Sequence, residues 1–289
     1  MTKANVAFVI NKNYIGQFKV TFYSLVTSNK DLEISVHLLQ SDLSDSDKED
    51  IKKFVNSLNA EIAFYQIDDG FFDGLPKMGY DNSFTAYYKV LLPYCLDFLP
   101  SVLYLDCDII VRGSLKPLFE NQTGKFLACA EDYKINKKRR EHVKKIVGSE
   151  DINYFNSGVI KFDFSDKSAI VSKEEVFEYI TSHKDDIRWH DQDILNHFYA
   201  KNCKFIDEKY NYTATYKSIL DIFVRKGKKK TVIVHYANWK PWKSNYIGKY
   251  YKLYKKTYDA LAGEYGVNFL QKRKLKEQIR LIFKYLLGR

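Results

Sequence analysis

Two aspartates follow directly on a short apolar segment. Residues 102–105 read Val-Leu-Tyr-Leu, and the next three are Asp106, Cys107 and Asp108. Along an extended chain, side chains two positions apart share a face, so both carboxylates can reach one cation. In open α/β sheets ligands bind beyond the carboxyl ends of the strands, which is where this pair would lie. Because carboxylate oxygens suit Mg²⁺ or Mn²⁺, the pattern indicates a divalent metal site.

The Asp-x-Asp pattern also occurs in proteins of different kinds. The same residues can form an ordinary turn that binds nothing. The pattern also opens haloacid-dehalogenase-type phosphatases, with Asp106 as the nucleophile, although those chains usually carry it near the N-terminus and here 105 residues precede it. An EF-hand calcium loop is excluded, because Ile109 and Ile110 stand where oxygen ligands are needed.

Alternating strand and helix patterns surround this pair. Strands are expected at residues 4–10, 34–40, 61–67, 102–105, 126–130, 158–162 and 231–235, and helices at residues 14–28, 45–58, 83–92, 173–183 and 191–200. Ser44 supplies the cap for the second helix, Pro93 is expected to stop the third, and residues 102–105 read as a central parallel strand. This order predicts an α/β fold, a Rossmann-like domain with a mixed, mostly parallel sheet. No linker or repeat divides residues 1–245, so we expect one domain there, followed by a basic helical tail over residues 246–289.

The composition is typical of a soluble globular protein. Of the 289 residues, 45% are hydrophobic and 28% are charged. No apolar run is long enough to span a bilayer, and the early run at residues 6–10 is too short for a signal peptide. The four cysteines show neither CxxC nor zinc-type spacing, so they are expected to be reduced and mostly buried. We therefore expect a cytoplasmic protein.

Most of the net charge of +10 lies in the tail. Residues 249–289 hold eleven Lys and Arg against three acids, a net charge of +8, which leaves +2 for residues 1–248. The nearly neutral main body argues against binding to nucleic acid. Apolar side chains recur at helical spacing near the C-terminus, at Leu275, Ile279, Ile282, Phe283 and Leu286. Such a helix predicts docking of residues 268–289 on an anionic membrane surface, at the inner face of the cell membrane; the alternative is that the stripe packs on the domain.

Five blocks in the same order resemble glycosyltransferase family 8, the retaining enzymes related to glycogenin and to bacterial lipopolysaccharide α-galactosyl- and glucosyltransferases. They are FVINKNY at residues 8–14, YLDCDIIV at 104–111, FNSGV at 155–159, HDQDILN at 190–196 and HYANWKPW at 235–242. The resemblance spans residues 4–245. It implies a GT-A fold whose nucleotide-binding half covers residues 1–115, and a UDP-sugar donor.

The resemblance assigns the metal site. Asp106 and Asp108 look like the motif that chelates Mn²⁺ (or Mg²⁺), which bridges the donor diphosphate, and His235 matches the third protein ligand. Lys240 resembles the lysine that contacts the diphosphate, where a cation would stabilise the leaving group.

The resemblance also implies residues around the donor. Asn156, Asp191 and Gln192 match positions near the anomeric carbon of the sugar, although Asp191 can equally be a helix N-cap, and Asp193 points elsewhere and is expected to be structural. The remaining donor-binding positions are expected to be Asn11, Asn13, Tyr14, Lys89, Cys107, Ser157 and Asn238.

This sequence departs from the family pattern at three places. The family commonly carries Asp where this chain has Asn11, and Arg where it has Lys89. A carboxylate is therefore missing at the base site, and a planar fork becomes a point charge. The loop between His235 and Lys240 is about one residue shorter than in the bacterial relatives, with Asn238 where Gly is frequent.

The expected reaction is transfer of galactose or glucose from a UDP-sugar to a saccharide or to a lipid-linked or cell-surface glycan, with retention at the anomeric carbon. Retention can follow a double displacement through an enzyme nucleophile, or front-face attack by the acceptor. Gln192, at the position facing the sugar's β-face, is a poor nucleophile, which favours front-face attack. Two alternatives are a metal-dependent phosphohydrolase that uses Asp106 and a non-catalytic nucleotide-sugar-binding membrane adaptor.

Overall fold

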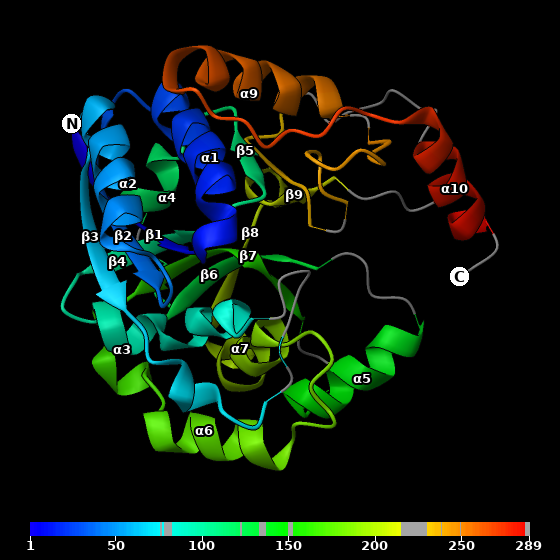
Figure 1. Cartoon of the computed structure of the whole chain (residues 1–289). Coiled ribbons are helices and arrows are strands. Elements are labelled where there is room, and N and C mark those ends of the chain that lie inside the picture. Colours follow the sequence, from blue (N-terminus) through cyan, green and yellow to red (C-terminus); the bar gives the residue numbers. More distant parts are fainter. Residues whose placement is uncertain are drawn as a thin grey trace.

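A computed structural model describes residues 1–75, 77, 83–121, 123–132, 137–149, 153–214, 230–237, 239–248 and 250–286. Its main sheet has the strand order β3-β2-β1-β4-β7-β6-β8 (Figure 1). The strands are β1 (Thr2–Val9), β2 (Leu32–Gln40), β3 (Glu61–Gln66), β4 (Ser101–Leu105), β6 (Leu127–Glu131), β7 (Phe155–Asp163) and β8 (Cys203–Ile206). Neighbours pair in parallel except β7, which is antiparallel to both β4 and β6. The mixed, mostly parallel α/β sheet predicted from the sequence is confirmed, but β4 is parallel to its neighbour on one side only.

A small second sheet explains how distant residues meet. It has the order β5-β10-β9, formed by β5 (Ile109–Val111), β10 (Ile233–His235) and β9 (Tyr212–Thr213). Strand β10 runs antiparallel to β5 and pairs His235 with Ile109, the residue after Asp108. The amide of Tyr236 donates to the carbonyl of Asp108 at 2.8 Å. This pairing carries His235 to the aspartate turn.

Helices cover both faces of the main sheet (Figure 1). On one face lie α1 (Ile15–Ser28), α2 (Asp45–Ser57), α4 (Lys116–Glu120) and α9 (Tyr251–Tyr265); on the other lie α3 (Leu92–Leu96), α5 (Lys137–Val147), α6 (Lys173–Ser182) and α7 (Asp191–Tyr199). Because side chains alternate along a strand, Phe8 of β1 packs in the core between the sheet and α1, while Ala7 and Val9 pack in the core on the opposite face, with α7. Ser44 caps α2 as the sequence predicted, and it forms a capping box with Asp47.

The region around Pro93 differs from the prediction. The expected helix at residues 83–92 is a 3₁₀ helix, η3 (Thr85–Leu91), and the chain then continues into α3 instead of stopping at the proline. Pro93 lies in the first turn of α3, where a backbone N–H has no helical partner, so its missing donor costs nothing.

The C-terminal tail contains two helices that differ in how they pack. Helix α9 buries Tyr254, Tyr258 and Leu261 in the same core as α1. Helix α10 (Leu275–Leu286) lies at the edge of the molecule (Figure 1). No helix in the described part of the chain is both long and apolar enough to cross a membrane.

Candidate active site

The turn between β4 and β5 carries both aspartates and is held from behind by α1. The buried hydroxyl of Thr21 lies 2.9 Å from the carbonyl oxygens of both Cys107 and Ile109 and donates to this pair. Ser24, one turn later on α1, accepts from the amide of Val111 at 3.0 Å. Because a packed helix fixes this turn on both sides, the aspartate side chains leave it in a defined direction.

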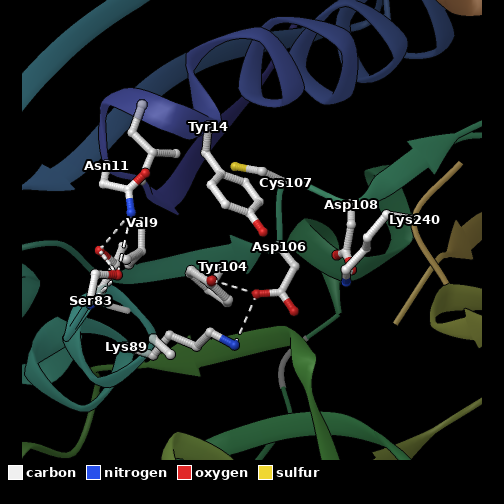
Figure 2. Close-up of a pocket in the computed structure, with 13 residues that line it drawn as sticks. Val9, Asn11, Tyr14, Ser83, Lys89, Tyr104, Asp106, Cys107, Asp108 and Lys240 are labelled. Atoms are coloured by element: carbon white, nitrogen blue, oxygen red, sulfur yellow. Dashed lines mark hydrogen bonds and ion pairs between the residues drawn. The ribbon is translucent and has the colours of Figure 1, made fainter. Parts of the chain in front are cut away.

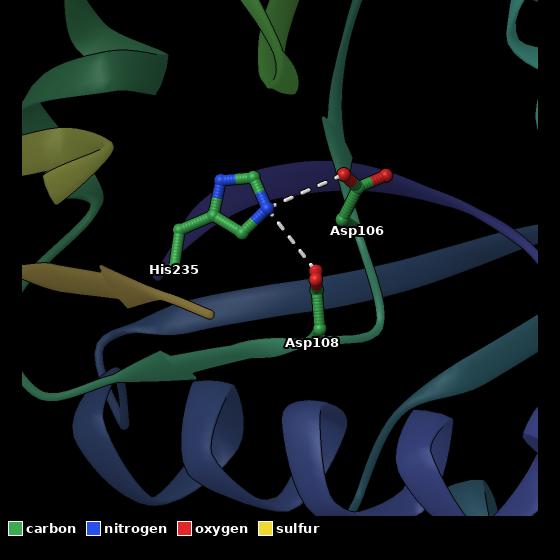
Figure 3. Close-up of side chains that lie close together, drawn as sticks. All are labelled: Asp106, Asp108 and His235. Carbon is green, nitrogen blue, oxygen red and sulfur yellow. Dashed lines mark ion pairs between the residues drawn. The ribbon is translucent and has the colours of Figure 1, made fainter. Parts of the chain in front are cut away.

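Asp106, Asp108 and His235 converge on one point (Figure 3). Their ligand atoms all lie within 4.8 Å of one another. The His235 Nε2 atom lies 3.2 Å from Asp108 Oδ1 and 3.5 Å from Asp106 Oδ2. Adjacent ligands about 2.1 Å from an octahedral ion stand about 3 Å apart, so these separations suit a divalent cation. Among the described residues Asp108 Oδ1 is buried without a hydrogen bond, as an oxygen reserved for a ligand would be. The donor set therefore fits Mn²⁺ or Mg²⁺.

Lys240 lies on the far side of Asp108. Its ammonium contacts Asp108 Oδ2 and lies 3.3 Å from the carbonyl oxygens of Tyr236 and Ala237. Burial raises the pKa of the Asp108 carboxyl, but the adjacent Lys240 ammonium outweighs burial and holds that pKa below its ordinary value. Asp108 is therefore ionised and ready to bind a cation.

Lys89 joins the aspartate turn to helix α7. Its buried ammonium lies 2.9 Å from Asp106 Oδ1 (Figure 2). It also lies 2.9 Å from Asp191 Oδ2. Burial lowers the pKa of this lysine, and the two carboxylates more than reverse that effect, so its pKa is above the ordinary value. Tyr104 donates to Asp106 Oδ1 at 2.6 Å. The contacts from Lys89 and Tyr104 to Oδ1 orient the Asp106 carboxylate.

The expected sugar-binding residues meet where β7 faces the start of α7. Asn156 donates its amide to Gln192 Oε1 at 3.0 Å, and the Ser157 hydroxyl donates to Asp191 Oδ2 at 2.7 Å. Since Asp191 also binds Lys89, this group is continuous with the aspartate turn. The N-cap of α7 is His190, so the interpretation of Asp191 as the cap is wrong.

A cavity of about 220 Å³ opens beside the aspartates (Figure 2). It is lined by Val9, Ile10, Asn11, Tyr14, Ser83, Thr85, Ala86, Lys89, Tyr104, Asp106, Cys107, Asp108 and Lys240. At its far end Asn11 donates to the hydroxyls of Ser83 and Thr85, both at 3.3 Å. Asn13, expected to bind the donor, is exposed and absent from the lining; its backbone amide donates to Asn11 Oδ1. Asn238 lies outside the described residues.

Two residues of this region, Gly158 and Asn211, have roles that the sequence did not reveal, although Gly158 lies in the FNSGV block. A Cβ added to Gly158 would lie 2.2 Å from His235 Cε1 and 2.9 Å from Asp106 Oδ2, so only glycine leaves room for the site. Asn211 accepts from His235 Nδ1 at 2.8 Å. No local pattern marks Asn211, and the FNSGV block contains Gly158 without showing its role, because each residue acts through contacts that only the fold creates. Asp193 is structural as expected, since the carboxylate is saturated by the side chains of His142 and Tyr154 and by two backbone amides.

Solved structures identify the fold. The structure matches a crystal structure of the galactosyltransferase LgtC in complex with donor and acceptor sugar analogs, with a TM-score of 0.76 and 22% identity over 89% of this chain and 95% of that chain. It also matches the glycosyltransferase GlyE of Streptococcus pneumoniae TIGR4, with a TM-score of 0.66 and 21% identity over 92% of this chain and 64% of that one. The chain has the GT-A glycosyltransferase fold, as predicted.

Sequence comparison gives the family. The model of glycosyl transferase family 8 matches residues 5–246, so the chain belongs to that family and is a glycosyltransferase. It is 27% identical over 253 residues to a lipopolysaccharide 1,2-glucosyltransferase of Escherichia coli, covering 82% of this chain and 73% of the relative. It is 26% identical over 259 residues to the lipopolysaccharide 1,3-galactosyltransferase of Salmonella typhimurium, covering 84% and 74%. Because the chain is a glycosyltransferase, the alternative of a phosphohydrolase is wrong.

Proposed function

We propose that this chain is a retaining hexosyltransferase that moves galactose or glucose from a UDP-sugar to a saccharide or to a lipid-linked or cell-surface glycan. The observation that carries the proposal is the convergence of Asp106, Asp108 and His235 beside a cavity at the carboxyl end of β4. The lipopolysaccharide hexosyltransferases among the relatives support the choice of sugars and acceptor.

Asp106, Asp108 and His235 would hold a Mn²⁺ or Mg²⁺ ion. When bound, the ion would supply charge neutralisation for the donor diphosphate. Lys240, next to Asp108, places a second positive charge where the diphosphate would leave. At the opposite end, the cavity between Asn11 and Tyr14 would receive the uridine.

Retention requires the acceptor to approach from the face that the diphosphate leaves, or a covalent intermediate. The residue on α7 that would face the sugar is Gln192, whose amide is already bonded to Asn156 and Ser157 and is a poor nucleophile. We therefore favour front-face attack, with Lys89 holding Asp191 and Asp106 in place around the donor sugar.

A panel of UDP-sugars tests the proposed reaction. The purified chain is incubated with UDP-galactose, UDP-glucose and other UDP-sugars in Mn²⁺, in Mg²⁺ and after chelation with EDTA, and released UDP is measured. We expect UDP release from a UDP-hexose with metal and none with EDTA, and an α-linked product by NMR once an acceptor is found. Metal-independent release, or release of phosphate from simple phosphate esters, would contradict the proposal.

We also propose that α10 docks the protein on an anionic membrane. Leu275, Ile279 and Phe283 are exposed by 72%, 43% and 59%, which supports membrane docking over packing of the apolar stripe on the domain. The cations of residues 272–274 are exposed beside them. The helix is held instead through Gln278, which donates to the Tyr246 carbonyl at 2.8 Å. An exposed apolar stripe flanked by cations fits a bilayer interface with anionic headgroups.

Serine replacement of Leu275, Ile279 and Phe283 together is expected to abolish flotation with vesicles that contain phosphatidylserine. The reason is that the variant keeps the cations but loses the apolar surface that would enter the bilayer. The matched control is Phe98→Ser, which removes another exposed aromatic ring (63% exposed) away from α10 and should float like the wild type. Equal flotation of the triple variant and the wild type would contradict membrane docking through α10.

A further inference from the structure

Asn211 is a buried residue between η6 (Glu208–Tyr210) and β9, and neither the metal set nor the cavity includes it. Within the described part of the chain, its side chain takes part in two hydrogen bonds. Oδ1 lies 2.8 Å from His235 Nδ1, and Nδ2 donates to Asn156 Oδ1 at 2.8 Å. Asn211 therefore bridges an expected metal ligand and an expected sugar-binding residue.

Backbone amides determine which way these side-chain amides point. The N–H of Gly158 donates to Asn156 at 3.1 Å, and a backbone N–H can only donate, so the atom that receives it is Oδ1. The Asn211 atom facing the same oxygen must then be its NH₂ group. That leaves Asn211 Oδ1 facing His235, and an amide oxygen only accepts, so the proton of this bond belongs to His235 Nδ1.

The same reasoning extends in the other direction. The N–H of Ser157 donates to Gln192 Oε1 at 3.2 Å, which fixes that atom as the oxygen. Asn156 Nδ2 also donates to it, at 3.0 Å, and the remaining Gln192 NH₂ group donates to Asp132 Oδ2 at 3.1 Å. Every bond from His235 to Asp132 thus has one direction, with each side-chain amide donating to the next oxygen.

The consequence for the metal site lies in the imidazole ring. With the proton on Nδ1, the neutral ring has its lone pair on Nε2, the atom 3.2 Å from Asp108 Oδ1 and 3.5 Å from Asp106 Oδ2. Only an unprotonated ring nitrogen can bind a metal ion, and the partner of the other nitrogen decides which one that is.

We propose that Asn211 is a positioning residue that holds His235 in the Nδ1–H form and so presents Nε2 to the metal site, while it keeps Asn156 and Gln192 in the orientation that faces the donor sugar. This inference rests on the proposed function, because it takes His235 as a metal ligand. Asn211 itself touches neither metal nor substrate; it acts through His235 and Asn156.

The protonation of the His235 ring tests the inference directly. Protein labelled with ¹⁵N at histidine is examined by long-range ¹H–¹⁵N NMR, metal-free and with Mg²⁺ and UDP, and the His235 signals are assigned with His235→Gln. We expect the neutral ring to carry its proton on Nδ1 in both states. A neutral ring with its proton on Nε2 in the wild type would overturn the inference, whether or not the protein transfers sugar.

Two variants separate positioning from folding. Asn211→Leu removes both contacts and should weaken Mn²⁺ binding in the presence of UDP, measured by EPR of free Mn²⁺, by about 10–100-fold. Asn211→Asp keeps the acceptor for His235 Nδ1–H and should lose less than about tenfold in Mn²⁺ affinity. It loses the donor to Asn156, so kcat should fall more than Mn²⁺ affinity.

The matched control is Asn29→Leu. Asn29 is equally buried, and its amide binds the carbonyl of Leu25 and the amide of Leu115, away from the metal site. It should lower thermal stability and leave Mn²⁺ affinity unchanged. Wild-type Mn²⁺ affinity and ring protonation in Asn211→Leu would overturn the inference and leave the proposed function standing. If that variant does not fold, wild-type NMR and the Asp variant decide.

Discussion

Replacing Asp108 with asparagine is expected to lower kcat for sugar transfer by at least about a hundredfold. A bound metal ion supplies several kcal/mol of charge stabilisation, and each 1.36 kcal/mol corresponds to a factor of ten in rate. Asparagine has nearly the shape of aspartate but lacks its charge. Asp108 is the acid that both His235 and Lys240 contact, so its neutralisation affects the metal ion and the lysine together.

Three measurements make this prediction specific. UDP release at saturating Mn²⁺ gives kcat, titration of Mn²⁺ gives the apparent metal affinity, and circular dichroism checks that the variant is folded. The control is Asp97→Asn, which removes a partly exposed aspartate that pairs with Lys167 at 3.1 Å far from the site and should keep full activity. Asp108→Asn with unchanged metal-dependent transfer would show that the cation does not bind at this turn.

The main sheet could be predicted because its strands are locally distinctive. Strands β1 and β2 each contain at least eight residues of mostly apolar sequence, and the cap of α2 is written in four consecutive residues. The small sheet could be predicted only in part. The strand expected at residues 231–235 corresponds to β10 (Ile233–His235), but β5 and β9 have three and two residues, too few to carry a periodic pattern. These two strands form because the rest of the fold brings them together with β10.

The same distinction applies to the candidate site. The spacing of Asp106 and Asp108 indicates a shared cation from local geometry alone, whereas His235 enters only through the order of blocks typical of the family. Lys89 is a lone lysine in sequence, and its two ion pairs depend on η3 packing against β4 and α7. Gly158 and Asn211 are required by contacts with residues 24 to 77 positions away, which no local pattern records.

Lys89→Met is expected to lower the free energy of unfolding by about 3 kcal/mol and to reduce transfer. The ammonium holds two carboxylates at 2.9 Å in a buried setting, and removing one partner of a buried ion pair costs about 3–5 kcal/mol. We expect the lower end of that range, because Asp106 keeps its hydrogen bond from Tyr104 and is partly exposed. Urea unfolding at neutral pH measures the change.

Two comparisons distinguish a role in the site from an effect on stability alone. Lys89→Arg keeps the positive charge, and the family commonly carries arginine here, so it should recover most of the stability and activity that Lys89→Met loses. Lys19→Met removes another buried lysine, whose ion pair at 2.7 Å is with the mostly exposed Asp50. Its loss should therefore cost less stability and leave kcat unchanged. If Lys89→Met were as stable and active as Lys19→Met, the link from Asp106 to Asp191 would not orient the donor site. If Lys89→Arg did not restore stability and transfer, this chain would specifically require the compact lysine ammonium at position 89. The planar guanidinium group would then not fit between the two carboxylates.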